Sequence, residues 1–431
     1  MYRKITAFLE AWKKNQYRKP LVLQGARQVG KTYSVLEFGR INYENVAYFN
    51  FETNPKLNRT FEENISPDYL IPILSHISGQ TIVKEKTLII FDEVQLCERA
   101  LTSLKYFCED APDYHIIVAG NLLGVAVNRA KFSFPVGKVD MKTMYPMDME
   151  EFMIAMGEEK LAAQVRQCFE TNTAMPSALH DAAMQLYRQY LVVGGMPECV
   201  LQFAQTRDYI LIRNTQDTIL ASYLNDMSKY NNLNEIKKTR LAYDNITVQL
   251  SKKNTRFQYK LIKKGGRASE FENAIEWLCL SGIVSQVYRI EQIKKPLENY
   301  RDIDAFKIYV SDLGLLCAKK DLAANDILYM AEELNDFKGG MAENYVNVQL
   351  SINGYHTYYW ESARGAEIDF VIQRNEQLIP IEVKSADNTR AKSLKVYMET
   401  YDPEYAIKLS AKNFAFEDNK KTVPLYAAFC I

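Results

Sequence analysis

The chain has 431 residues, which at roughly 100 to 200 residues per domain predicts two to four domains. Apolar residues make up 47% of the sequence and charged residues 25%, a composition that excludes a disordered or fibrous chain. Lysine plus arginine and aspartate plus glutamate both total 53, so the formal charge is zero. Binding to nucleic acid or to an anionic membrane would therefore require a local basic patch.

The longest apolar runs, such as residues 88–91, are far shorter than the roughly 20 residues that cross a bilayer, so we expect no membrane partner. The N-terminus has charged residues among its apolar ones and does not have the pattern of a signal peptide. The seven cysteines show no C-x-x-C spacing, which disfavours a zinc site or a redox pair. We expect buried thiols in a reducing, cytoplasmic environment.

The first third of the chain alternates strands with helices. Strands are predicted at residues 21–23, 46–51, 88–91 and 116–119, with helical stretches between them. This rhythm predicts an α/β domain over residues 1–150, a doubly wound parallel sheet covered by helices on both faces.

Three further segments follow. Residues 151–235 lose the strand signal and predict a helical lid or connector. Residues 236–335 mix helices with a short extended stretch, which predicts a small domain of winged-helix type. Residues 336–431 predict a separate α/β domain, whose helices and strands are expected at 341–352, 355–360, 368–373, 378–384 and 391–401, before two short terminal strands.

A glycine-rich loop follows the first predicted strand and opens a helical pattern. It fits G-x-x-x-x-G-K-[ST], in the context that this phosphate-binding motif requires. Glycines let backbone N–H groups turn inward around the β-phosphate, and the helix N-terminus adds the positive end of its dipole. Lys31 is expected to reach the β and γ oxygens and Thr32 to bind Mg²⁺. The predicted nucleotide-binding residues are Gly25, Ala26, Arg27, Gln28, Val29, Gly30, Lys31 and Thr32.

Polar residues also end two later strands. Asp92 and Glu93 follow an apolar run, at the carboxyl edge where open α/β sheets bind ligands. We expect Asp92 to hold Mg²⁺ and Glu93 to polarise the water that attacks the γ-phosphate. Asn121, after the strand at 116–119, is expected either to orient that water or to be a turn residue.

The chain resembles the bacterial and archaeal AAA-type ATPases with a C-terminal domain of unknown function in the runs LQGARQVGKT, IIFDEVQ, VAGNLLG, YPMDMEEF and YLVVGGMPE. The similarity continues in KIYVSDLGLL, GGMAENYV, EIDFVI and IPIEVKS, which in that family form a restriction-endonuclease-like end. The resemblance implies an intracellular ATP-binding protein. The chain differs from the family pattern at Asn121, where Ser is common, and at Gly137-Lys138, where Gly-Arg is common.

Acidic residues and a lysine gather near the C-terminus. On a strand, Glu382 and Lys384 share one face. If Asn375-Glu376 is a two-residue turn, Asp369 pairs opposite Glu382, with about 5 Å between their Cβ atoms. Glu343 on the preceding helix could complete a Mg²⁺ site of the D…E-x-K nuclease type. The alternative is that Glu382 and Lys384 form only a solvated ion pair.

The middle of the chain holds a basic segment. Residues 252–267 contain seven Lys or Arg and no acid, with Phe257 and Tyr259 between them. This segment could bind the phosphates of DNA or RNA with a salt-dependent affinity. The alternative is a solvated helix or β-wing.

The sequence as a whole predicts a Mg²⁺-dependent ATPase, with ATP and Mg²⁺ as its cofactors, that acts on nucleic acid. The alternative is an ATP-dependent regulatory switch whose nuclease-like C-terminal domain only binds a protein partner.

Overall fold

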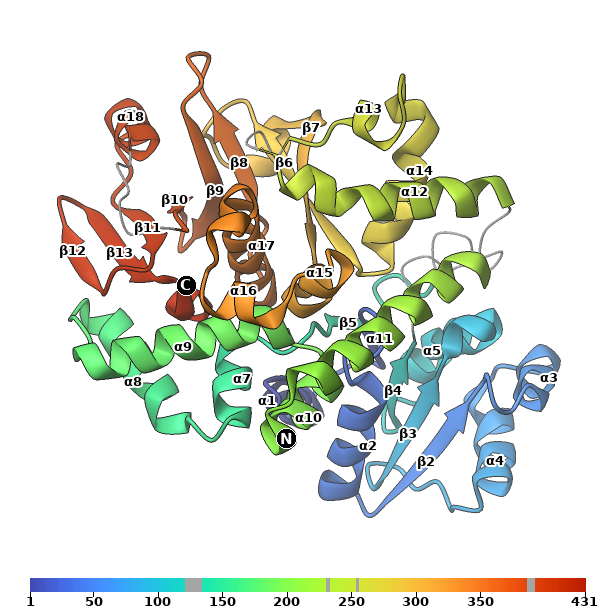
Figure 1. The fold of residues 1–431 in the computed structure, drawn as a ribbon. Coiled ribbons are helices and arrows are strands. Elements are labelled where there is room, and N and C mark those ends of the chain that lie inside the picture. The colour runs from blue at the N-terminus through green and yellow to red at the C-terminus, as the bar shows by residue number, and fades with distance from the viewer. Residues whose placement is uncertain (121–133, 230–232, 253–255, 386–391) are drawn as a thin grey trace. The chain divides into compact units, whose positions relative to one another are not determined.

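The computed structural model describes residues 1–120, 134–229, 233–252, 256–385 and 392–431. Asn121 lies outside these residues. The chain divides into two compact units, one formed by residues 3–145 with 280–282 and the other by the remaining residues (Figure 1). No described helix is long and apolar enough to cross a membrane.

The first unit is built on a five-stranded parallel sheet in the order β2-β3-β4-β1-β5. Its central strands β3 and β4 are buried throughout, as expected for a sheet covered on both faces. This architecture confirms the predicted α/β fold. The strands are β1 (Leu21–Gln24), β2 (Asn45–Asn50), β3 (Thr87–Asp92), β4 (His115–Ala119) and β5 (Asp140–Thr143).

Helices cover the two faces of this sheet. The side chains of α3, α4 and α5 share one hydrophobic cluster with Phe49 and Phe91. On α2, a Cβ at Gly39 would lie 2.7 Å from Val46 Cγ2, so only glycine allows this close approach to β2. The helical elements are α1 (Ile5–Lys14), α2 (Lys31–Asn42), α3 (Lys56–Glu63), α4 (Pro67–Ser78), the 3₁₀ turn η1 (Val94–Leu96) and α5 (Glu98–Asp110).

His115 at the start of β4 is a buried titratable group. Its Nδ1 lies 2.8 Å from the hydroxyl oxygen of Tyr43, and its ring packs edge-on against Tyr43 and Trp12. Burial, helped by nearby Arg18 and Lys13, lowers the pKa of His115 from 6.5 to about 4. The imidazole is therefore neutral in the folded protein at neutral pH.

We expect the free energy of unfolding to fall as the pH drops from about 6.5 to about 4, because in this window the unfolded chain binds a proton that the folded chain does not. The loss from this one group amounts to about 3 kcal/mol. Urea titrations of His115→Phe should show a flatter pH dependence than the wild type. The exposed His76 is the control, and an equal flattening in His76→Phe would contradict the assignment to His115.

The second unit begins with a run of helices. Its first helix has a capping box, in which Asp148 accepts a hydrogen bond from the Glu151 N–H at 2.8 Å and Glu151 accepts one from the Asp148 N–H at 3.2 Å. These helices are α7 (Met149–Ala155), α8 (Glu159–Thr171), α9 (Ser177–Val193), α10 (Pro197–Thr206) and α11 (Tyr209–Lys229).

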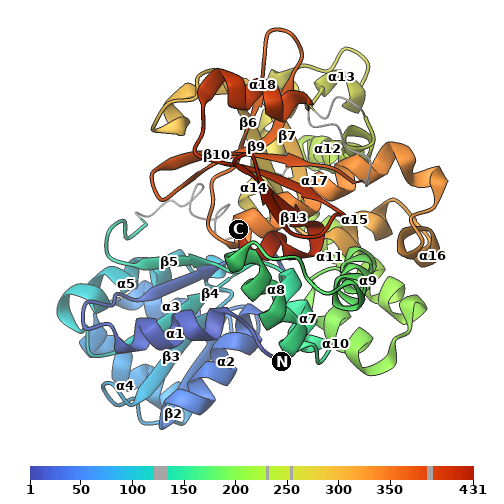
Figure 2. The same cartoon turned by 90° about the vertical axis from the view of Figure 1, so that its left-hand side faces the viewer.

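An eight-stranded mixed sheet fills the rest of this unit, in the order β12-β13-β11-β10-β9-β8-β6-β7. The helices α17 and α18 lie on opposite sides of it (Figure 2). The strands are β6 (Val284–Ile290), β7 (Arg301–Val310), β8 (Tyr358–Glu361), β9 (Glu367–Arg374), β10 (Gln377–Val383), β11 (Ala406–Ser410), β12 (Ala415–Glu417) and β13 (Lys420–Pro424).

This sheet crosses the predicted domain boundary at residue 336. The short extended stretch predicted within 236–335 is instead the antiparallel pair β6–β7, and β6 pairs in parallel with β8 through Tyr288 and Tyr358. The C-terminal strands therefore do not form a separate sheet, because β6 supplies the backbone partner that the edge of β8 needs. Three short strands, not two, follow α18.

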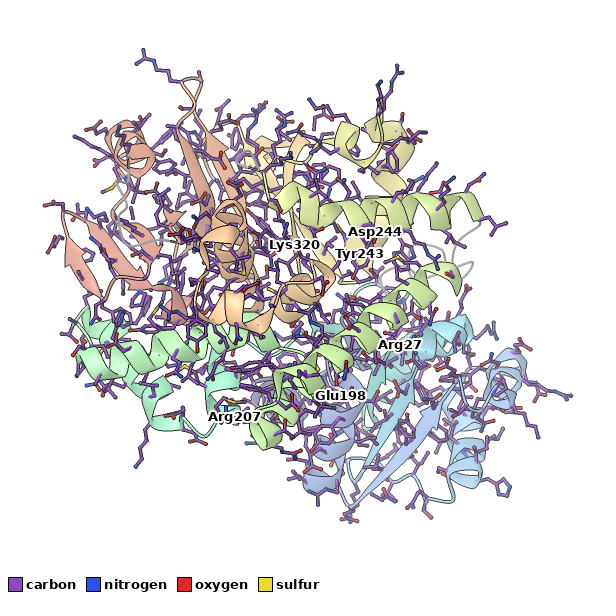
Figure 3. The ribbon with its side chains drawn as sticks, viewed as in Figure 1. Arg27, Glu198, Arg207, Tyr243, Asp244 and Lys320 are labelled. Atoms are coloured by element: carbon purple, nitrogen blue, oxygen red, sulfur yellow. The ribbon has the colours of Figure 1, made fainter. Side chains whose placement is uncertain are left out.

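The remaining helical elements flank this sheet. They are α12 (Leu233–Leu250), α13 (Tyr259–Ile262), α14 (Ala268–Leu280), η2 (Leu297–Tyr300), α15 (Leu313–Lys319), α16 (Ala324–Leu328), η3 (Glu332–Leu334), α17 (Asn335–Ile352), α18 (Lys392–Tyr401) and η4 (Leu425–Cys430). Lys319 links α15 to α12, since its Nζ lies 2.7 Å from Asp244 Oδ1 and 3.8 Å from the centre of the Tyr243 ring, both labelled in Figure 3.

One buried aspartate joins two of the glycine-containing runs. Asp312 caps α15 by accepting a hydrogen bond from the Leu315 N–H at 2.8 Å, and it accepts a second from the Gly195 N–H at 2.7 Å. A Cβ at Gly195 would lie 2.1 Å from the carbonyl oxygen of Met147, which leaves room only for glycine. Burial raises the pKa of Asp312 to about 6. These contacts give a packing reason for the glycine and the aspartate in the runs YLVVGGMPE and KIYVSDLGLL.

Candidate functional site

The glycine-rich loop lies between β1 and α2, as its motif predicts. Three of its residues have positive φ: Gly25 at 145°, Gln28 at 65° and Gly30 at 88°. A Cβ at Gly25 would lie 2.1 Å from the carbonyl oxygen of Met144, so the backbone passes where no side chain fits. A loop of this shape that opens a helix can turn several N–H groups toward one anion.

Lys31 is folded back over this loop. Its Nζ donates hydrogen bonds to the carbonyl oxygens of Gly25 at 2.9 Å and Ala26 at 2.7 Å. Burial lowers the pKa of Lys31 to about 8, against the opposing fields of Glu93 and Asp92. The side chain thus lies at the loop where it is predicted to bind the phosphates. Arg27 of the same loop, labelled in Figure 3, is half-buried by its exposed surface area.

Thr32 and Asp92 meet at the carboxyl edge of the sheet. The Thr32 hydroxyl donates a hydrogen bond to Asp92 Oδ2 at 2.9 Å, and Asp92 Oδ1 accepts one from the Glu93 N–H at 3.0 Å. The Asp92 side chain is almost fully buried. A hydroxyl and a carboxylate are the hard oxygen ligands that Mg²⁺ prefers, so these residues fit the predicted ion.

Tyr48 completes this group and was not predicted. Its hydroxyl donates a hydrogen bond to Asp92 Oδ2 at 2.7 Å, and burial raises the pKa of Tyr48 to about 12. Tyr48 lies on β2, which pairs with β3 so that Asn50 is opposite Asp92. Only this lateral pairing, which the sequence does not specify, brings Tyr48 to the site.

Glu93 has a left-handed backbone conformation, with φ at 52°. This conformation is unfavourable for a residue with a Cβ, and such strain is often found at functional sites. Its Oε2 accepts a hydrogen bond from Gln95 Nε2 at 2.5 Å. Glu93 therefore follows Asp92 in a fixed turn at the strand end. The other predicted catalytic residue, Asn121, lies outside the described residues.

The C-terminal hairpin has the predicted register. Strands β9 and β10 pair from Gln377 opposite Arg374 to Ile381 opposite Phe370. The two turn residues between these strands, Asn375 and Glu376, have positive φ, as a tight two-residue hairpin turn requires.

The four residues predicted for a nuclease-like site come together around this hairpin. Asp369 Oδ2 accepts a hydrogen bond from the Val383 N–H at 2.7 Å, and Glu382 Oε1 lies 2.9 Å from Lys384 Nζ. Burial, followed by the charge of Glu343, raises the pKa of Asp369 to about 7. The Glu382 side chain is only 2% exposed, so its ion pair with Lys384 is not the solvated pair of the alternative interpretation.

Lys307 on β7 is a member of this cluster that sequence reasoning missed. Its side chain is 1% exposed, its Nζ lies 3.2 Å from Glu343 Oε2, and it forms a second ion pair with Glu367. The Tyr309 hydroxyl donates a further hydrogen bond to Glu343 Oε2 at 2.8 Å. The only sequence signal was a lysine within the apolar stretch that ends β7.

The predicted metal arrangement of the C-terminal cluster is not formed. Among the residues that the structure describes, no three His, Cys, Asp or Glu side chains are grouped so that they could hold a metal ion. Each predicted carboxylate has another partner: Lys307 for Glu343, a backbone N–H for Asp369 and Lys384 for Glu382.

The residues of the basic segment 252–267 are not all exposed and not all unpaired. Phe257 is buried and stacks on Phe306 with ring centres 5.2 Å apart, so it belongs to the core. Lys263 forms an ion pair with Glu270 at 3.0 Å. The exposed face of α14, which follows the segment, carries Glu272 and Glu276. Lys252, Lys260, Lys264 and Arg267 remain exposed.

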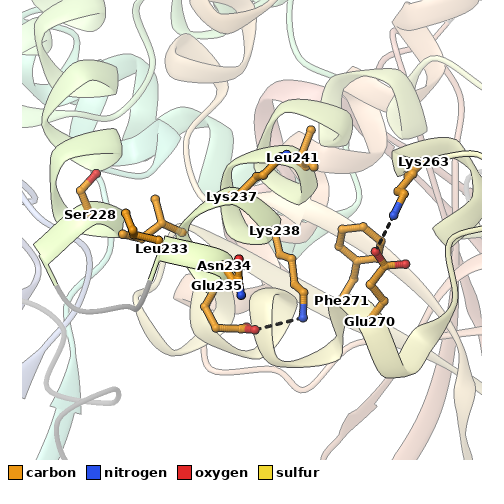
Figure 4. A pocket seen from close by; sticks show the side chains of 11 residues that line it. Ser228, Leu233, Asn234, Glu235, Lys237, Lys238, Leu241, Lys263, Glu270 and Phe271 are labelled. Atoms are coloured by element: carbon orange, nitrogen blue, oxygen red, sulfur yellow. Dashed lines mark hydrogen bonds and ion pairs between the residues drawn. The ribbon is translucent and has the colours of Figure 1, made fainter.

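A broad pocket of about 1150 Å³ lies beside this segment, along α12 and the start of α14 (Figure 4). Its walls include the ion pairs Glu235–Lys238 and Lys263–Glu270. Two of the three lysines that line the pocket are therefore paired with glutamates, and no residue of the glycine-rich loop lines it.

Comparison with known protein families divides the chain into three. Residues 17–153 match an AAA domain, residues 184–326 match a domain of unknown function (DUF8612), and residues 338–428 match another (DUF4143). No curated protein matches the chain.

Several solved structures are similar to the chain at low identity. The Walker-type ATPase PABY2304 of Pyrococcus abyssi is 13% identical, with a TM-score of 0.43, over 73% of this chain and 94% of that chain. The Aeropyrum pernix ORC2 protein is 12% identical, with a TM-score of 0.36, over 79% and 95%. The Thermotoga maritima RuvB Holliday junction branch migration motor is 14% identical, with a TM-score of 0.30, over 65% and 87%.

The AAA match and the architecture of the first unit agree with each other. The matched residues include the glycine-rich loop, the Thr32–Asp92 contact and all five parallel strands. The DUF4143 match includes Glu343, Asp369, Glu382 and Lys384. The chain therefore contains an AAA domain, which includes the glycine-rich loop, and a C-terminal domain of unknown function.

Proposed function

We propose that the chain hydrolyses ATP with Mg²⁺ at the loop of residues 25–32. The observation that carries this proposal is the contact between Thr32 and Asp92, which brings two oxygen ligands together beside Lys31. These two residues would hold the ion. A bound Mg²⁺ would supply positive charge against the charge that develops on the phosphate during transfer.

The protein's own groups have separate roles in this proposal. Lys31 exchanges the carbonyl oxygens of Gly25 and Ala26 for the β and γ oxygens of the nucleotide, and the loop amides bind the β-phosphate. Glu93 accepts a proton from the attacking water and so acts as the general base. Tyr48 orients Asp92 through its hydrogen bond.

The test is the rate of ATP hydrolysis by the whole chain with Mg²⁺ and with EDTA in its place. We expect hydrolysis to require Mg²⁺ and to be restored when Mg²⁺ is added back. An equal rate in EDTA would contradict the role given to Thr32 and Asp92. We also propose that the chain acts on nucleic acid, which binds at the exposed lysines of residues 252–267 and stimulates the ATPase. The same assay with added DNA or RNA tests this stimulation.

A second proposal concerns the C-terminal cluster: it recognises a partner and does not cleave nucleic acid. The observation that favours it is Lys307, whose buried ammonium group already forms ion pairs with Glu343 and Glu367. A divalent ion at these carboxylates would have to displace or repel this cation. Plasmid cleavage that needs a divalent ion and disappears in Asp369→Ala would contradict this proposal and support a nuclease.

Lys307→Met is expected to lower the free energy of unfolding by about 3 to 5 kcal/mol, because it leaves two partly buried carboxylates without their buried cation. Chemical denaturation of the two proteins at neutral pH measures the difference. The matched control is Lys238→Met, which breaks a more exposed ion pair with Glu235 and should cost less than about 1 kcal/mol. Equal effects of the two substitutions would show that Lys307 is not essential to the cluster.

A further inference from the structure

A small cavity in the second unit lies where three parallel strands end. Strands β10 and β11 are parallel, and so are β11 and β13. Ser385, Ala411 and Leu425 lie just beyond the carboxyl ends of these strands, and all three line a cavity of about 240 Å³. Crevices at the carboxyl ends of parallel strands are the usual ligand sites of open α/β sheets.

Helices α9 and α17 close the cavity. From α9 come Met184, Tyr187 and Arg188, and from α17 come Lys338, Met341 and Ala342, while Met330 completes the wall. No aspartate or glutamate is among the described residues that line it, although two of them are cationic. The cavity is thus a positively charged hollow with a largely apolar wall.

Arg188 is the most informative of these residues. It is half-buried, and it has no hydrogen-bond or ion-pair partner within the described part of the chain. Its Nε is buried without any partner. A guanidinium group has five N–H donors and always carries its charge, so leaving it unpaired in a partly desolvated place is unfavourable. A bound anion would remove this cost.

Lys338 adds positive charge without using all its donors. Its Nζ donates hydrogen bonds to the carbonyl oxygen of Met330 at 2.8 Å and to Asn335 Oδ1 at 2.9 Å. Because an ammonium group has three N–H donors, one remains for a ligand. The two hydrogen bonds also hold the charge in place at the cavity wall.

We propose that this cavity binds a small organic anion, a carboxylate or phosphate monoester with an apolar body. The guanidinium group of Arg188 matches the two oxygens of either anionic group. Three flexible methionine side chains offer an adaptable wall to the apolar part. The volume equals that of about eight water molecules, which limits the ligand to a small molecule. No residue of the proposed ATP site takes part.

The test uses the whole chain with ¹³C-labelled methionine methyl groups, observed by NMR. Sodium phosphate, phenyl phosphate and sodium butyrate are titrated separately, so that the phosphate and carboxylate arms are distinguished. We expect saturable shifts of the Met184, Met330 and Met341 methyl signals with phenyl phosphate or butyrate, and weaker binding of inorganic phosphate, which lacks an apolar body. Absence of saturable shifts with all three probes would overturn the proposal.

Arg188→Met keeps the apolar volume and removes the charge, so it should weaken binding of the anion roughly tenfold to a hundredfold. Arg59→Met, which changes an exposed arginine in the other unit, should leave the affinity unchanged. If Arg188→Met does not fold, Arg188→Lys keeps the charge without the planar fork and should bind with intermediate affinity. Unchanged affinity in a folded Arg188 variant would also overturn the proposal.

Discussion

Lys31→Ala is expected to weaken ATP binding at least a hundredfold, roughly the loss of one or two hydrogen bonds to a charged group. The ammonium group of Lys31 lies over the loop, where it donates to the carbonyl oxygens of Gly25 and Ala26. In the bound state it would donate to phosphate oxygens, and alanine has no group that could replace it. Isothermal titration of the whole chain with ATP and Mg²⁺ measures the change.

The control for this substitution is Lys14→Ala, which removes an exposed lysine of the same unit and should not affect ATP binding. Circular dichroism should show that both variants are folded. If Lys31→Ala bound ATP as tightly as Lys14→Ala, nucleotide binding would have to be assigned to another part of the chain.

Glu93→Gln is expected to leave ATP binding intact and to slow hydrolysis by roughly 10² to 10⁴, the usual contribution of a general base. The amide is nearly isosteric with the carboxylate, so the strained turn after Asp92 can be kept, but it accepts no proton at neutral pH. Single-turnover hydrolysis under saturating ATP measures the chemical step, and titration in the same buffer measures the affinity.

Glu10→Gln is the matched control for Glu93→Gln, because it makes the same chemical change at an exposed position of α1. It should hydrolyse ATP at the wild-type rate. A Glu93→Gln protein that turned over as fast as this control would show that another group activates the water.

Features of the fold that depend on neighbouring residues were predictable. The glycine-rich loop, the strand ending in Asp92 and the hairpin at Asn375-Glu376 are each encoded within about ten residues, and the structure contains all three. The missed strand β5 has the sequence DMKT, without an apolar run, and it exists because it pairs with β1. A polar edge strand of this kind lacks the apolar pattern by which strands are predicted from sequence.

Features that depend on distant pairing were not predictable. Tyr48 reaches Asp92 only through the lateral register of β2 and β3, and Lys307 reaches Glu343 only because β7 belongs to the C-terminal sheet. The predicted carboxylates Glu343, Asp369 and Glu382 all lie close enough to Lys384 for their charges to act on it. Their charge balance could not be foreseen, because it is supplied by a lysine from a segment assigned to another domain.

The pairing of β6 with β8 determines where the chain can be truncated. A fragment that starts at residue 336 leaves one side of β8 with unsatisfied amides and carbonyls, open to self-association. The same cut removes Lys307, so Glu343 would lose its buried counter-ion. A fragment that keeps these contacts has to include β6 and β7 as well as the DUF4143 residues.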